Sequence, residues 1–260
     1  MKSIKTISFI GSGNVATQLA TALFSKQFLI HQIYSKSIDN ATVLAKKVNA
    51  DATSDISELN NKADIYIVSV SDDAIEQVLQ QFTHKEKLIV HTSGTVEMDI
   101  FKTNGFVTYG IFYPLQTLSK TSTVDFSTIP FCIEAVSPTV FETLNQTAAQ
   151  LSNRVYSINS IQRKHLHVAA VFACNFTNEM YQIASKICAD NNLDFDILKP
   201  LILETANKIL TKTPKEAQTG PAKRKDFKTI EKHIKLLEND IKTQELYTLI
   251  TQHILNSTQN

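Results

Sequence analysis

The chain has 260 residues, of which 43% are hydrophobic and 20% charged, a composition typical of soluble globular proteins with one large or two modest domains. Its formal net charge of +1 argues against a nucleic-acid or membrane-surface partner. The three cysteines have no metal-ligand spacing, which predicts reduced thiols, a cytoplasmic location and no metal site. No stretch approaches the ~20 apolar residues of a membrane span.

The first predicted elements are a short apolar strand that ends at Ile10 and a helix that begins near Val15. Between them, Gly11 permits a tight turn, and Gly13 has no Cβ to keep a pyrophosphate away from the backbone. Ala16 is small enough for the helix to pack on the strand. This is the G-x-G-x-x-A form of the dinucleotide fingerprint, and it predicts a cofactor site at Gly11, Ser12, Gly13, Asn14 and Val15. The alternative is a glycine turn that binds nothing.

Strands and helices then alternate up to about residue 158. Apolar runs predict further strands at 28–34, 63–70, 87–91, 106–112, 130–135 and 154–158. Helical patterns fall between them at 15–24, 38–48, 56–59, 74–82, 98–102 and 138–151. Alternation of this kind predicts an α/β fold, a doubly wound and mostly parallel Rossmann sheet over residues 1–159.

After residue 160 the pattern becomes helical throughout. Helices are expected at 162–189, 196–210, 227–237 and 245–255, with Asp226 and Thr243 as N-caps of the last two. We therefore predict an all-α C-terminal domain over residues 160–260, which binds substrate and forms a homodimer.

The corner after the second strand favours NADP over NAD. An NAD site usually places a carboxylate there for the ribose 2′-OH, but this chain has Ser35 and Lys36, with no acid before Asp39. A hydroxyl and an ammonium suit a 2′-phosphate. Val70 and Ser71 follow the strand that flanks the nucleotide, and they are the remaining predicted cofactor residues. Lys36 as an ordinary solvated lysine is the alternative.

Five further motifs carry a family resemblance. They are VSVSDDAI at 68–75, HTSG at 91–94, YPLQT at 113–117, LHVAAVFACNFTN at 166–178 and TGPAKRKD at 219–226. The N-terminal half resembles pyrroline-5-carboxylate reductase and the deazaflavin-dependent NADP oxidoreductases. The whole chain resembles a bacterial branch of that superfamily that ends in a helical domain of unknown function. The resemblance implies the fold and an NADP site, but no particular reaction.

Polar side chains at two strand ends are candidates for chemistry on a substrate. His91 is a candidate proton donor, because imidazole titrates near neutral pH, and the alternative is a buried histidine satisfied by backbone. Ser93 offers a hydroxyl to a substrate carbonyl or carboxylate, and Tyr113 follows the next strand. The alternative for Tyr113 is a rigid proline turn that shapes the pocket. For Ser71, the alternative is that it or Asp72 simply caps the next helix.

The long helix supplies His167, Asn175 and Asn178, which α-helical spacing places on one face with Lys164 and Val171. The similar hydroxyacid dehydrogenases and ketopantoate reductases carry a catalytic lysine four residues before an asparagine. Counting back from Asn175 gives Val171 instead. His167 is then the best candidate acid, with Asn175 as a second catalytic residue and Asn178 as a substrate ligand.

Arg224 lies in a basic triplet after a Gly-Pro-Ala turn and is a candidate clamp for an anionic substrate. A solvated basic loop is the alternative. Together these features predict an NADP-dependent oxidoreductase that acts on a small carbonyl, imine or hydroxyacid. A non-catalytic NADP-binding sensor is the second hypothesis, and the absent lysine at Val171 is its main support.

Overall fold

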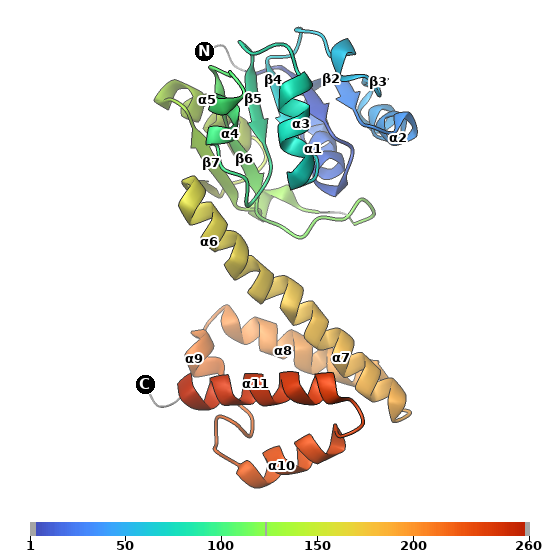
Figure 1. The fold of residues 1–260 in the computed structure, drawn as a ribbon, viewed down its shortest axis with the longest axis vertical. Coiled ribbons are helices and arrows are strands. Elements are labelled where there is room, and N and C mark those ends of the chain that lie inside the picture. Colours follow the sequence, from blue (N-terminus) through green and yellow to red (C-terminus); the bar gives the residue numbers. More distant parts are fainter. Residues whose placement is uncertain (1–3, 123, 258–260) are drawn as a thin grey trace. The chain divides into compact units, whose positions relative to one another are not determined.

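The computed structural model describes residues 4–122 and 124–257 (Figure 1). They divide into two compact units between Cys174 and Asn175, later than the expected boundary at residue 160. The first unit contains an eight-stranded sheet of order β3-β2-β1-β4-β5-β6-β7-β8. Its strands are β1 (Thr6–Ile10), β2 (Leu29–Tyr34), β3 (Asp51–Thr53), β4 (Ile65–Val68), β5 (Leu88–His91), β6 (Tyr109–Pro114), β7 (Phe131–Ala135) and β8 (Val155–Ser157). The short strand β3 is not apparent in the sequence.

All neighbouring strands are parallel except β6 and β7, which are antiparallel. This confirms the predicted mostly parallel, doubly wound sheet. The chain leaves β1 to one side through β2 and returns on the other side through β4. That reversal of strand order opens a crevice at the carboxyl ends of β1 and β4, where doubly wound folds bind their ligands.

Helices cover both faces of the sheet, so β4 and β5 are completely buried. One apolar core lies beneath α1 (Asn14–Ser25), α2 (Ile38–Val48) and α5 (Pro138–Ala149). The other lies beneath α3 (Asp72–Gln81) and α4 (Asp99–Thr103) and includes the single-turn helix η1 (Ile56–Glu58). A further turn, η2 (Phe126–Thr128), precedes β7.

The predicted long helix is divided into three segments. α6 (Ser160–Ala170) begins with a capping box between Asn159 and Gln162. The π-helical segment η3 (Val171–Phe176) follows, and α7 (Thr177–Asp190) continues from it. A π turn holds more residues than an α turn, so the α-helical phase does not carry through η3. The expectation that Asn175 and Asn178 share one regular α-helical face with His167 is therefore wrong.

The second unit is helical, as expected. Besides α7 it contains η4 (Phe195–Leu198), α8 (Lys199–Ile209), α9 (Pro214–Ala217), α10 (Phe227–Leu236) and α11 (Ile241–Ser257). Asp226 caps α10 as predicted by accepting the Thr229 N–H. Thr243 is not the cap of α11, because that helix begins earlier and the Thr243 N–H donates to Asp240. None of the helices among residues 4–122 and 124–257 has the length and apolar character needed to span a bilayer.

Candidate nucleotide and substrate site

A cleft of about 660 Å³ lies at the carboxyl ends of β1, β2, β4, β5 and β6. It is bounded by the turn that follows β1, the corner after β2 and the starts of α1 and α3. All nine predicted cofactor residues line it, and three predicted substrate-end residues line it as well. These residues are Gly11, Ser12, Gly13, Asn14, Val15, Ser35, Lys36, Val70 and Ser71, with Ser93, Tyr113 and His167.

The turn after β1 has the geometry that a dinucleotide phosphate requires. Gly11 has φ +124°, and a Cβ there would lie 2.2 Å from the carbonyl oxygen of Ser69. Gly13 has open space where its Cβ would be, and its position as N-cap of α1 leaves the first helical N–H groups without a side-chain acceptor. The first turn of α1 also has no acidic residue. A pyrophosphate can therefore approach free N–H groups at the positive end of the helix dipole.

The corner after β2 suits a phosphate better than a ribose hydroxyl. The Ser12 hydroxyl donates to Ser35 Oγ at 2.8 Å, which orients Ser35 beside the glycine turn. The exposed Lys36 ammonium reaches Gln77 Oε1 at 3.4 Å and is the only cation at this corner of the cleft among the described lining residues. Asp39 is in the first turn of α2 and does not line the cleft. None of the described residues that line this corner thus offers a carboxylate to a ribose 2′-OH.

The start of α3 is similarly open. Ser71 is the N-cap residue, but its hydroxyl makes no cap hydrogen bond. Ser71 is thus the N-cap that the alternative interpretation expects, but it makes no side-chain capping bond, and the residue lines the cleft. Asp72 accepts a short hydrogen bond from the Thr95 hydroxyl, which links α3 to the turn after β5.

At the other end of the cleft, Tyr113 Oη and His167 Nδ1 are 3.2 Å apart. A Cβ on Gly94 would lie 2.5 Å from His167 Nδ1 and 3.0 Å from Tyr113 Oη, so the missing side chain of Gly94 makes room for the pair. Burial raises the pKa of Tyr113 to about 12, with nearby Cys132 adding to the effect. Tyr113 therefore keeps its proton at neutral pH.

Ser93 holds the turn between β5 and α4. Its Oγ accepts the backbone N–H groups of Thr95 and Val96, each at 3.0 Å. The hydroxyl of this buried side chain lines the cleft, and among the described residues its own hydrogen has only Thr95 Oγ1, at 3.5 Å, as an acceptor.

His91 is not placed as the expected proton donor. Its side chain is 0% exposed, stacks on Phe101 at a centroid distance of 5.4 Å, and is not among the residues that line the cleft. Its Nδ1 accepts the Ser93 N–H at 3.2 Å. Burial, with the nearby Arg163 guanidinium, lowers the pKa of His91 to about 3. His91 is therefore the buried histidine of the alternative interpretation, but backbone satisfies only its Nδ1, because Nε2 has no hydrogen-bond partner among the described residues. We assign this neutral imidazole no proton transfer.

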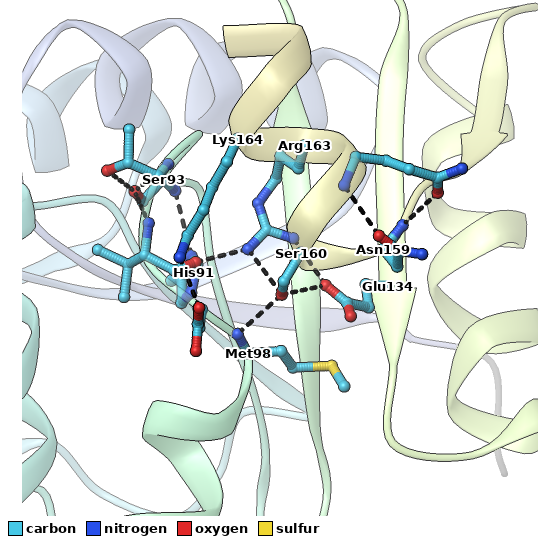
Figure 2. Close-up of polar contacts among 12 residues, drawn as sticks. His91, Ser93, Met98, Glu134, Asn159, Ser160, Arg163 and Lys164 are labelled. Atoms are coloured by element: carbon cyan, nitrogen blue, oxygen red, sulfur yellow. Dashed lines mark hydrogen bonds and ion pairs between the residues drawn. The ribbon is translucent and has the colours of Figure 1, made fainter. Parts of the chain in front are cut away.

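A buried ion pair that sequence reasoning missed anchors α6 to the sheet (Figure 2). Arg163 is 0% exposed, and its Nη1 lies 2.7 Å from Glu134 Oε2 on β7. Its Nη2 donates to the Val96 carbonyl at 2.5 Å and to Ser160 Oγ at 3.1 Å. The Ser160 hydroxyl donates to Glu134 at 2.6 Å and accepts the Met98 N–H at 3.1 Å.

This network ties the first turn of α6 to both β7 and the turn after β5. His167 lies one helical turn beyond Arg163 on the same helix. The ion pair that anchors this helix therefore also fixes the position of His167 along the cleft. The sequence gives only a weak signal for it, an arginine at the start of a helix without a nearby acid. Its partner Glu134 is 29 residues away and belongs to another element.

Asn175, Asn178 and Arg224 belong to the second compact unit. Asn175 is exposed within η3, Asn178 is exposed on α7, and Arg224 is exposed on a turn that follows Gly220. Their assignments remain predictions.

Comparison with known proteins is consistent with this site. Residues 6–94 match the family model described as NADP oxidoreductase coenzyme F420-dependent, and residues 129–254 match a domain of unknown function, DUF2520. A solved structure of a candidate NADP oxidoreductase from Bacteroides fragilis is 46% identical, with a TM-score of 0.92, over 97% of this chain and 98% of that chain. The chain belongs to this family of NADP oxidoreductases. None of the curated proteins compared with it matches.

More distant structures share the fold of this NADP oxidoreductase family. An imine reductase from Myxococcus stipitatus in complex with NADP⁺ is 16% identical, with a TM-score of 0.70 over 98% of this chain and 94% of that one. A pyrroline-5-carboxylate reductase from Coxiella burnetii is 15% identical, with a TM-score of 0.61 over 99% of this chain and 98% of that one. These comparisons confirm three predictions: the family, its Rossmann fold and NADP as its cofactor.

Proposed function

We propose that this protein is an NADP-dependent oxidoreductase that acts on a C=N or C=O group of a small molecule. The observation that carries the proposal is the Tyr113–His167 pair, which lines the same cleft as the glycine turn of the nucleotide fingerprint. Bound NADPH supplies a hydride. The chain's own residues then have to hold the nucleotide and provide a proton.

The turn after β1 and the corner after β2 bind the nucleotide. Free N–H groups at the start of α1 hold the pyrophosphate, and Ser35 with Lys36 holds the 2′-phosphate. Val70 and Ser71 lie beside them at the end of β4 and position the rest of the nucleotide.

The proton comes from the Tyr113–His167 pair. If His167 is protonated on Nε2, the Tyr113 hydroxyl donates to Nδ1 and Nε2–H remains available. If His167 is protonated on Nδ1, that hydrogen goes to Tyr113 and the phenol hydrogen remains available. In either tautomer one donor hydrogen is left for substrate, and Ser93 adds a second donor in the cleft. An imine nitrogen or a carbonyl oxygen is the acceptor that such donors recognise.

Imines head the list of substrates because distant relatives of the same fold are an imine reductase and a pyrroline-5-carboxylate reductase. Asn175 as a catalytic residue, Asn178 as a substrate ligand and Arg224 as an anion clamp complete the proposal. Replacing Arg224 with methionine is then expected to weaken the binding only of substrates that carry a carboxylate or phosphate.

The test combines nucleotide binding with turnover. NADPH is titrated by fluorescence, and its oxidation is followed by absorbance with a panel of cyclic imines, oxoacids and aldehydes. His167→Asn and Tyr113→Phe are expected to lower kcat by about 10²-fold or more while leaving the Kd of NADPH within twofold. His165→Asn is the matched control, since His165 Nδ1 bonds to the Ile161 carbonyl of its own helix and the residue does not line the cleft.

The alternative is a non-catalytic NADP sensor. Val171 supports it, because the similar hydroxyacid dehydrogenases have their catalytic lysine at that spacing from an asparagine. Tight NADPH binding with no turnover across the panel would favour the sensor. Failure to bind either NADPH or NADH would contradict both proposals.

We also propose that the protein is a cytoplasmic homodimer formed through its helical unit. Of the described residues of that unit, four are buried: Cys188, Ala222, Ile230 and Thr251. Large apolar side chains are at least 55% exposed at Leu193, Ile197, Leu201, Leu203, Leu210, Phe227, Leu236, Ile241 and Leu249. A unit with so small a core is stabilised by a second copy that covers these side chains. Sedimentation at micromolar concentration should give the dimer mass, and a stable monomer would contradict the proposal.

A further inference from the structure

The segment 115–122, which follows β6, is fastened beside the start of α1. Gln18 Nε2 donates to the carbonyl oxygens of Ser119, in a short hydrogen bond, and of Ser122, at 2.7 Å. The Ser122 hydroxyl also donates to the Ser119 carbonyl, which closes a tight turn around the residues between them. Figure 1 shows this connection reaching from β6 toward α1. Two parts of the chain that are about a hundred residues apart are thus held together at the nucleotide end of the sheet.

The attachment point is close to the predicted pyrophosphate site. Gln18 is one helical turn after Asn14, the first residue of α1. Helical side chains tilt toward the N-terminus of their helix, so the Gln18 amide lies over the first turn of α1. The segment that it holds therefore lies against the side of α1 near its first turn.

Lys120 is at the centre of this fastened segment. It is exposed, and no ion pair of its ammonium occurs within the described residues. It lines the cleft together with Gly11–Val15, and it also lines the neighbouring hollow formed by Thr17 and Gln18. Its position on the boundary of both hollows places it on the α1 side of the cleft.

The other charged side chains of the cleft do not pair with the pyrophosphate. Apart from the histidine, the charged residues among the described lining residues are Lys36, Asp72 and Lys120. Lys36 is at the corner after β2, where the 2′-phosphate is expected, and Asp72 is engaged by Thr95. Without Lys120, the two charges of a pyrophosphate would have no cation beside them among the described lining residues.

We propose that Lys120 pairs with the pyrophosphate of the bound dinucleotide, as a cofactor-binding residue supplied by the 115–122 segment. The proposal rests on nucleotide binding in the proposed function. Pairing with the pyrophosphate, which NADPH and NADH share, also separates the role of Lys120 from that of Lys36.

Fluorescence titration of NADPH and NADH with the full chain tests this assignment. Lys120→Met is expected to raise the Kd of both nucleotides by the same factor, about tenfold, and Lys120→Arg should restore most of the affinity. Lys36→Met should raise the Kd of NADPH alone. Lys102→Met on α4, which is exposed and outside the cleft, is the matched control and should change neither. Gln18→Ala should reproduce part of the Lys120→Met effect in the same ratio, because it releases the segment.

The outcomes distinguish failure of the Lys120 assignment from failure of the proposed function. Unchanged affinities in Lys120→Met, with normal binding by the parent protein, would overturn the Lys120 assignment and leave the proposed function intact. A loss confined to NADPH would also overturn it by moving Lys120 to the 2′-phosphate. A parent protein that binds neither nucleotide would overturn the assignment together with the proposed function.

Discussion

Replacing Arg163 with methionine tests whether the buried anchor of α6 stabilises the first unit. Arg163 is 0% exposed and Glu134 is 17% exposed, so both charges are largely removed from water and depend on each other. Methionine retains much of the apolar length of arginine but removes the guanidinium. Of the side-chain donors in the described part of the chain, the Glu134 carboxylate then keeps only the Ser160 hydroxyl.

The expected loss follows from this burial. Breaking a buried ion pair by removing one partner typically costs about 3–5 kcal/mol, because the remaining charge stays desolvated. Partial exposure of Glu134 lets water reach its carboxylate, which places Arg163→Met near the lower end, at about 3 kcal/mol. Glu134→Gln retains an acceptor for Nη1 and should cost less, about 1–3 kcal/mol. Arg163 Nε has no hydrogen-bond partner among the described residues. The guanidinium therefore stabilises the fold less than a fully hydrogen-bonded one would.

The free energy of unfolding is measured by urea denaturation, followed by far-UV circular dichroism at one fixed protein concentration. Arg163→Met, Glu134→Gln and the double variant form a double-mutant cycle. Lys164→Met is the matched control on the same helix. Its ammonium pairs with Glu97 at 2.5 Å, but both side chains are well exposed, so its loss should be too small to resolve.

A coupling free energy of at least about 1 kcal/mol between Arg163 and Glu134 is the expected result. Additive single effects, with coupling below about 0.5 kcal/mol, would refute the reasoning that the two charges depend on each other. A loss from Lys164→Met as large as that from Arg163→Met would refute the assignment of the effect to burial.

Three further results are expected. Gly94→Ala places a Cβ 2.5 Å from His167 Nδ1, so it should displace the pair with Tyr113 and lower kcat by at least about tenfold, with NADPH affinity retained. Gly11→Ala should abolish measurable NADPH binding, since it combines φ +124° with a backbone clash, and normal binding would contradict the turn geometry. His91 has its pKa lowered from 6.5 to about 3 in the folded state, so the unfolded state takes up the proton first as the pH falls. Stability should therefore fall below pH 6.5 by up to about 1.4 kcal/mol per pH unit, and His91→Gln should flatten that slope in urea titrations.

The nucleotide end of the cleft follows closely from the sequence, because local rules govern it. Gly11 has to be a glycine because of its own backbone angle and the strand end beside it, and Gly13 leaves open the space through which a phosphate approaches the backbone. The alternation of apolar strands and amphipathic helices likewise fixed the doubly wound sheet, since each element carries its own periodicity. The corner at Ser35 and Lys36 faces the cleft because it directly follows β2.

The substrate end depends on contacts between distant elements, which periodicity does not report. Because His91 is at the carboxyl end of a strand, the sequence predicted that its side chain lies in the cleft. Packing on Phe101 instead buries it beneath the Ser93 turn. Arg163 reads as an ordinary helical residue until β7 brings Glu134 to it.

The sequence by itself therefore determined the fold class, the glycine turn and the nucleotide corner, because residues adjacent in the chain decide them. Only the tertiary structure decided which histidine meets Tyr113 and which lysine lies beside the start of α1. Those pairings join segments 54 and about a hundred residues apart, and packing of the whole unit sets their distances.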